Sequence, residues 1–182
     1  MKLNLNFSSQ IITQKELVLI PAYTRNEKNG KKEQAKLVNS NWPKEFKDSF
    51  SNIVSSENFK GKTGEQFIFH LENGTSVLAC GLGEKAKLSA ELLRNEIARI
   101  YKGLKNNTGN LSIMIDGFKI GGKLEKTVYT ITESLLFTEY EFNRYKSESK
   151  APLLQTVDFF TDEKKKGSIK IEKALQNAQI CR

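Results

Sequence analysis

The sequence predicts an α/β fold of three layers, with a mixed β-sheet flanked by helices. Apolar runs of strand length alternate with amphipathic segments of helix length along the chain. An order of strand, helix and strand favours parallel pairing through a crossover. The 182 residues, of which 38% are hydrophobic and 27% charged, are enough for one domain with its own core.

The first two predicted strands have different patterns. Residues 3–7 alternate apolar and polar side chains, as a half-exposed strand does, whereas residues 16–20 form a continuous apolar run typical of a buried strand. We expect Pro21 to close that run. From Tyr23 to Lys36 the chain is polar and rich in lysine, which indicates a surface loop that could lead into a helix.

A β-hairpin and two further strands follow. Residues 66–71 and 76–80 flank a turn that contains Asn73-Gly74, a pair that supplies the positive φ angles of a tight turn. Short apolar runs at 111–115 and 153–160 predict two more strands.

Four segments have the apolar spacing of amphipathic helices. One starts at Pro43, one has Ser89 as its N-cap, and one runs from about 124 to 142. On the first helix, one face carries Phe46, Phe50, Ile53 and Val54. The last helix has a stripe that we expect to pack on polypeptide downstream: Ile171, Leu175, Ala178 and Ile180.

Composition points to a cytoplasmic protein. Cys80 and Cys181 lie far apart in an otherwise cysteine-free chain, which is typical of a reducing compartment. The N-terminus lacks the apolar core of a secretion signal, and no apolar run is long enough to cross a membrane. The net charge of +8 would assist DNA binding, but the lysines are scattered along the sequence.

Residues able to perform catalysis are scarce. His70 is the one histidine, so a zinc site is not expected, and no Gly-x-Ser-x-Gly motif occurs. We therefore assign no catalytic, cofactor-binding or metal-binding residue. Residues 81–86, Gly-Leu-Gly-Glu-Lys-Ala, match a dinucleotide-binding turn, but the next helix begins only after Ser89, and Asp116 lies about 30 residues further on instead of about 20. Glycines that serve a turn at a strand end are the favoured interpretation.

Four segments resemble the N-terminal domains of the leucine (cytosol) aminopeptidase family. Phe59-Lys60-Gly61-Lys62-Thr63-Gly64-Glu65 is similar to that family's F-x-G-x-x-G-E stretch. Residues 77–83 and the helix at 89–104, with Arg94, resemble its strand, glycine turn and helix. Residues 133–146 resemble its helix ending in Y-x-F-(D/N)-x-Y-K, and residues 174–182 resemble its linker helix.

The resemblance implies a macro-domain-like fold at residues 1–165 and the start of a linker helix at 166–182. It further implies a C-terminal catalytic domain with two divalent metal ions, zinc or manganese, and a hexameric parent enzyme that removes N-terminal residues from peptides. This chain would carry none of the catalytic residues and would support oligomer assembly and substrate access. Two alternatives stay open: a nucleic-acid-binding module that uses the basic surface, and a nucleotide- or ADP-ribose-binding domain.

Overall fold

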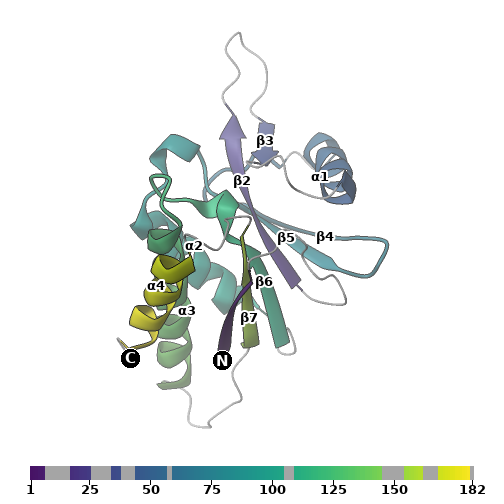
Figure 1. Ribbon diagram of the computed structural model, residues 1–182. Coiled ribbons are helices and arrows are strands. Elements are labelled where there is room, and N and C mark those ends of the chain that lie inside the picture. The colour runs from purple at the N-terminus through teal and green to yellow at the C-terminus, as the bar shows by residue number, and fades with distance from the viewer. Residues whose placement is uncertain are drawn as a thin grey trace.

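The computed structural model describes residues 1–6, 17–25, 34–37, 44–56, 59–104, 109–144, 154–161 and 168–180. Within them a seven-stranded sheet lies between helices (Figure 1). The strands are β1 (Lys2–Asn6), β2 (Leu17–Arg25), β3 (Gln34–Leu37), β4 (Gln66–His70), β5 (Ser76–Gly81), β6 (Gly109–Met114) and β7 (Leu154–Phe160). The α-helices are α1 (Lys44–Ser56), α2 (Ala90–Gly103), α3 (Leu124–Arg144) and α4 (Ser168–Ile180). Two short 3₁₀ helices, η1 (Lys85–Lys87) and η2 (Ile115–Phe118), follow β5 and β6.

The sheet is mostly parallel, as predicted. Its order is β1-β7-β6-β2-β5-β4, and β3 pairs with the end of β2. All neighbours from β1 to β5 in that order run parallel, whereas β4 and β3 are antiparallel to β5 and β2. Because β2, β5 and β6 are parallel, their carboxyl ends meet at one edge of the sheet.

Two apolar cores on opposite faces of the sheet make the three layers. Successive side chains of a strand point to opposite faces, so Leu19 of β2 belongs to one core and Ile20 to the other. Helices α2, α3 and α4 cover the first face, for example through Ile97 and Leu135, and α1 contributes Phe50 to the second. The predicted three-layer α/β class is confirmed.

The end of β2 differs from the prediction. The strand does not close at Pro21 but continues to Arg25, and β3 at residues 34–37 lies where the end of a surface loop was predicted. Proline is tolerated because β6 pairs with Leu17–Leu19 and β3 with Ala22–Arg25, so Pro21 lies in the gap between these two partners. A four-residue strand without an apolar run gives too weak a pattern to be recognised.

The helix starts and the hairpin agree with the sequence. Ser89 caps α2, and its hydroxyl accepts a hydrogen bond from Leu92 N at 3.1 Å. The predicted hairpin forms between β4 and β5, with Gly74 at a φ of 83° in its turn. On α1, Phe50 is buried and Val54 packs against the same core; Pro43 and the side chains of Phe46 and Ile53 lie outside the described residues.

Helix α4 packs within this chain, contrary to the expected downstream contact. Ile171, Leu175 and Ala178 are all buried, and the first two belong to the core that α3 shares. Only Ile180 of the predicted stripe is exposed, at 77%. The stripe therefore docks α4 beside α3 (Figure 1).

Candidate functional site

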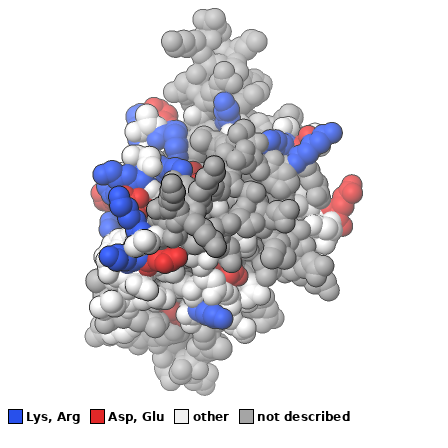
Figure 2. Space-filling model, viewed as in Figure 1, with Lys and Arg blue, Asp and Glu red and all other residues white. Residues whose placement is uncertain are grey.

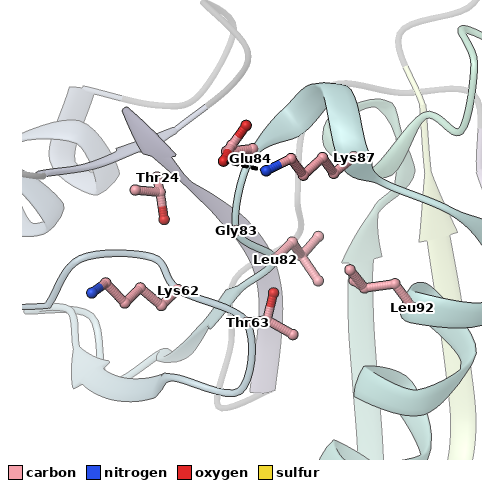
Figure 3. A pocket seen from close by; sticks show the side chains of 8 residues that line it. All are labelled: Thr24, Lys62, Thr63, Leu82, Gly83, Glu84, Lys87 and Leu92. Atoms are coloured by element: carbon pink, nitrogen blue, oxygen red, sulfur yellow. Dashed lines mark hydrogen bonds and ion pairs between the residues drawn. The ribbon is translucent and has the colours of Figure 1, made fainter. Parts of the chain in front are cut away.

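The most promising place for a site is the junction between the carboxyl ends of β2 and β5. From β2 the chain leads by way of β3 to α1, whereas β5 leads to α2 on the opposite face. Open α/β sheets commonly bind ligands at such a switch point. Two shallow hollows lie there, with volumes of about 320 Å³ and 350 Å³, and they share Thr63 and Leu92. The first is lined by Thr24, Lys62, Thr63, Leu82, Gly83, Glu84, Lys87 and Leu92 (Figure 3).

The glycine loop, which we define as residues 59–65, forms one wall of this junction. Phe59 anchors it in the second core, where its ring meets Phe50 edge-on at 6.2 Å between centroids. Glu65 closes it, because one carboxylate oxygen accepts hydrogen bonds from Lys60 N at 2.9 Å and Lys62 N at 3.1 Å. The loop is thus held by its own first and last residues.

Backbone hydrogen bonds join the glycine loop to the turn after β5. Gly81 N donates to Glu65 O at 2.7 Å, and Gly83 N donates to Gly61 O at 2.8 Å. Between them Leu82 N donates to Ala22 O at 2.9 Å. The amides of residues 81, 82 and 83 are therefore already occupied and do not face a phosphate. The glycines therefore serve a turn at a strand end, and the geometry does not support the dinucleotide interpretation.

Gly81 is the point of closest approach between the loop and the strand. A Cβ there would overlap the carbonyl oxygen of Lys62 and lie 2.8 Å from the carbonyl carbon of Gly61. Gly61 has a φ of 70°, a conformation that side chains disfavour, and it packs against the Tyr23 backbone. Glycine is therefore required at 81 because a side chain has no space there, and at 61 because of the backbone conformation.

Helix α2 contacts the same loop through a buried carboxylate. The side chain of Glu96 is only 2% exposed and lies 3.3 Å from Arg99 Nη1. Burial raises the pKa of Glu96, while the Arg99 charge and a hydrogen bond from the Gly64 backbone oppose that rise. No pattern in the sequence distinguishes Glu96 from the surface glutamates, so this contact could not be predicted.

A second polar cluster, Tyr23–Lys85–Gly117, joins the ends of β2, β5 and β6. The buried Tyr23 hydroxyl donates to Gly117 O at 2.8 Å and accepts from Lys85 Nζ at 3.0 Å. Lys85 Nζ also donates to Gly117 O at 3.0 Å and to Lys119 O at 3.3 Å. Burial, and then the positive charge of Lys119, lower the pKa of Lys85 to about 8.

At neutral pH the Lys85 ammonium is still protonated and directs its donors to oxygens of the protein itself. Burial raises the pKa of Tyr23, which keeps its hydroxyl neutral. The cluster therefore holds three strand ends together and presents no free nucleophile or base. Sequence reasoning missed it because the three residues are far apart along the chain.

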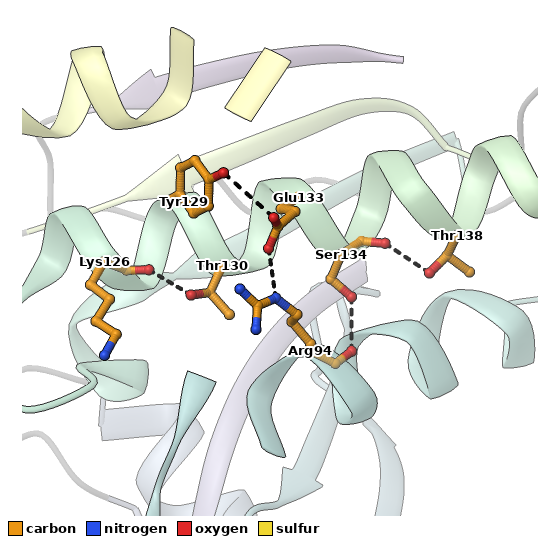
Figure 4. Close-up of polar contacts among 7 residues, drawn as sticks. All are labelled: Arg94, Lys126, Tyr129, Thr130, Glu133, Ser134 and Thr138. Carbon is orange, nitrogen blue, oxygen red and sulfur yellow. Dashed lines mark hydrogen bonds and ion pairs between the residues drawn. The ribbon is translucent and has the colours of Figure 1, made fainter. Parts of the chain in front are cut away.

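Two family-like segments meet where α2 packs on α3. Arg94 Nε lies 2.6 Å from Glu133 Oε2, and both side chains are partly exposed (Figure 4). Beside this ion pair, Ser134 Oγ donates to the backbone oxygen of Arg94 at 2.8 Å. Arg94, from the segment that includes the helix at 89–104, thus pairs with Glu133, the first residue of the segment 133–146.

The residues considered for catalysis have structural surroundings. His70 is exposed on the edge strand β4, with Nδ1 3.0 Å from Ser76 Oγ. Cys80 is fully buried, its thiol donates to Ile20 O at 3.4 Å, and burial raises its pKa. Cys181 lies outside the described residues. Asp116 of η2 lies 3.4 Å from Nζ of Lys119, the residue that follows η2, and the two form an ion pair.

Across the described ranges, no group of three or more His, Cys, Asp or Glu is placed to hold a metal ion. No described helix has the length and apolar character needed to cross a membrane. On the face shown in Figure 2, Lys and Arg side chains are interspersed with Asp and Glu. On that face the mixture gives no support to a nucleic-acid-binding surface.

Comparison with known proteins identifies relatives of one kind. Residues 19–149 match the model of the cytosol aminopeptidase family, N-terminal domain. A probable cytosol aminopeptidase from Clostridium tetani is 32% identical over 143 residues, covering 75% of this chain and 30% of that protein. Another, from Protochlamydia amoebophila, is 32% identical over 128 residues, covering 65% of this chain and 25% of that protein.

Solved structures show the same fold. A mutant of tomato leucine aminopeptidase has a TM-score of 0.63 at 20% identity and covers 98% of this chain and 36% of its own. The bottromycin maturation enzyme BotP has a TM-score of 0.56 at 16% identity, covering 92% of this chain and 31% of its own. The chain spans about a third or less of the relatives it matches. By the match over residues 19–149, this chain belongs to the cytosol aminopeptidase family, as its N-terminal domain.

Proposed function

We propose that this chain is the non-catalytic N-terminal domain of a leucyl aminopeptidase. The full-length parent would remove N-terminal amino acids from peptides in the cytoplasm, with two divalent metal ions, zinc or manganese, in a separate C-terminal catalytic domain. The observation that carries the proposal is the family match over residues 19–149 in a chain that covers only 30% of its Clostridium tetani relative. The remaining length of such a relative is ample for a second domain.

The described geometry supports a domain without chemistry of its own. The described residues do not fit a two-metal site, because they contain no group of three or more His, Cys, Asp or Glu side chains placed to hold a metal ion. At the switch point, the Glu65 and Glu96 carboxylates and the backbone amides of residues 81–83 are engaged in joining the glycine loop, β5 and α2 to one another. We therefore assign catalysis to residues that follow in the parent enzyme.

The role of the domain would be to support oligomer assembly, with a hexamer as the expected state of the parent, and to shape the access of substrate. We propose residues 1–165 as the macro-like domain and residues 166–182 as the start of a helix that links it to the catalytic domain.

The test is hydrolysis of leucine p-nitroanilide with Mn²⁺ or Zn²⁺ added. The 182-residue chain is compared with the product of its gene extended by about 300 residues, a length set by ordinary domain sizes. We expect turnover only in the extended protein, abolished by EDTA and accompanied by the mass of a hexamer in sedimentation. Metal-dependent turnover by the short chain would refute the non-catalytic assignment, and a reading frame that stops at Arg182 would refute the parent enzyme.

A further inference from the structure

The outer face of α3 carries an aromatic pair with no counterpart elsewhere among the described residues. Phe137 is 61% exposed and Tyr140 is 57% exposed, although both are large side chains. They are three residues apart on a helix and therefore lie on the same side of it, one turn from each other. We call these two residues the α3 aromatic pair.

A polar border lies next to the pair. The Arg94–Glu133 ion pair is one turn before Phe137 on the outer side of α2 and α3, and Tyr129 Oη lies 3.5 Å from Glu133 Oε1 (Figure 4). An aromatic centre beside satisfied polar groups is the usual composition of a protein interface. Glu133 adds a negative charge to this border, and the described residues place no lysine cluster around it. A nucleic acid is therefore a poor match.

The helix that presents the pair is held rigidly. Helix α3 packs between α2 and α4, and its inner side chains Ile131 and Leu135 are buried in the first core. Ser134 also bonds to the backbone of α2. A surface fixed in this way loses little conformational entropy when a partner covers it.

The direction of the helices indicates which partner this is. Helices α3 and α4 each follow a strand of the parallel set, lie side by side and run the same way (Figure 1). The carboxyl end of α4 is therefore directed toward the half of α3 that carries Phe137 and Tyr140. Polypeptide that continues beyond α4, as the length of the relatives implies, would leave α4 toward that half of α3.

We propose that the α3 aromatic pair is the docking surface for the catalytic domain of the same polypeptide. This inference rests on the proposed function. Two aromatic side chains are a small contact for two separate proteins, but a covalent tether within one polypeptide raises the effective concentration, up to about millimolar when the tether is short, and a small contact is then sufficient. A second copy of the chain, which has no tether, would need a larger surface.

Hydroxyl-radical footprinting compares the 182-residue chain with the extended gene product. In the extended protein we expect the modification rates of Phe137 and Tyr140 to fall by about fivefold, because interface cores exclude water. Ile68, which is 55% exposed on the edge strand β4, serves as the matched control and should react equally in both proteins.

Unchanged rates at both aromatic residues in an extended protein that hydrolyses leucine p-nitroanilide would overturn this inference alone. Protection that appears in the short chain at high concentration would also overturn it, since the occupant would then be a second copy. An extended protein without activity that still protects the pair would support the docking surface while refuting the proposed function. A gene that ends at Arg182 would overturn both.

Substitution gives an independent measurement. Phe137→Asp combined with Tyr140→Asp should lower the thermal midpoint of the extended protein by several degrees and that of the short chain by much less, because the pair is exposed in the short chain. Ile68→Asp should change both proteins by equal amounts. Equal changes for the aromatic double variant would contradict docking at α3.

Discussion

The glycine loop and the outer face of α3 both belong to segments that resemble the aminopeptidase family, yet their residues are used in opposite ways. In the loop, Phe59 is buried, Gly61 lies against another strand, and the Glu65 carboxylate is hydrogen bonded to the loop itself. On α3, Phe137 and Tyr140 leave more than half of their surface in solvent. A motif shared with relatives can therefore specify a fold in one place and provide a surface in another, and only burial and contacts distinguish the two.

The largest expected effect concerns the fit between loop and strand. Gly81→Ala should lower the free energy of unfolding by about 3 kcal/mol, because its Cβ meets backbone atoms that cannot move without displacing the loop. Urea denaturation measures the change. Gly103→Ala is the matched control: no atom lies within 4 Å of its Cβ at the end of α2, and it should be neutral or slightly stabilising. If the two variants behaved alike, the loop would not be packed as described.

An effect of intermediate size is expected from one hydroxyl group. Tyr23→Phe should cost about 1–2 kcal/mol, since it leaves Gly117 O and Lys85 Nζ each without one partner in a buried site. Tyr140→Phe should cost less than about 0.5 kcal/mol in this chain, because that side chain is exposed. Thermal or urea unfolding measures both variants. A comparable loss of unfolding free energy in both would mean that the buried Tyr23 cluster and the outer face of α3 do not differ in this way.

The smallest effect is a dependence on pH. Burial raises the pKa of Glu96, so the folded chain binds this proton more tightly than the unfolded chain does. The resulting stabilisation is complete below the unfolded pKa of about 4.3 and is lost as the pH rises through the higher folded value.

The free energy of unfolding of the native chain should therefore fall, relative to Glu96→Gln, as the pH rises from about 4 toward neutrality. Urea titrations at several pH values measure this difference. Parallel curves for the two proteins would show that the carboxylate of Glu96 is not held out of water in solution.

The sequence was sufficient for the layers but not for the polar contacts between them. The Asn73-Gly74 turn predicted the hairpin, Ser89 the start of α2, and apolar periodicity the long helix α3, because each depends on residues that are neighbours in sequence. Periodicity failed at β3, although β2 is its neighbour in sequence, because a four-residue strand without an apolar run gives too weak a pattern. Glu96 and the Tyr23–Lys85–Gly117 cluster were missed for another reason, since a buried ionisable group is defined by the residues that surround it, and these are distant in sequence.

The placement of α4 gives a different lesson. Its apolar stripe was recognised correctly, but the partner was not, because periodicity shows that a face is buried and does not show which surface covers it. The structure supplies α3 as that partner. Conversely, the helical spacing of α3 marks Val128, Ile131 and Leu135, which are buried, and leaves out Phe137, which is exposed; Tyr140 follows the apolar side and is nevertheless exposed.

The first strand also has a consequence for synthesis of the chain. Strand β1 pairs with β7, so residues 2–6 find their partners at 156–160, near the opposite end of the sequence. At translation rates of about 5–20 residues per second, roughly 8–30 s pass between the emergence of these two strands from the ribosome. During that time β1 has no strand to pair with and β7 does not yet exist to cover the adjacent edge of β6. The sheet can be completed only when nearly the whole domain has left the ribosome, and until then the edge of β6 stays unpaired.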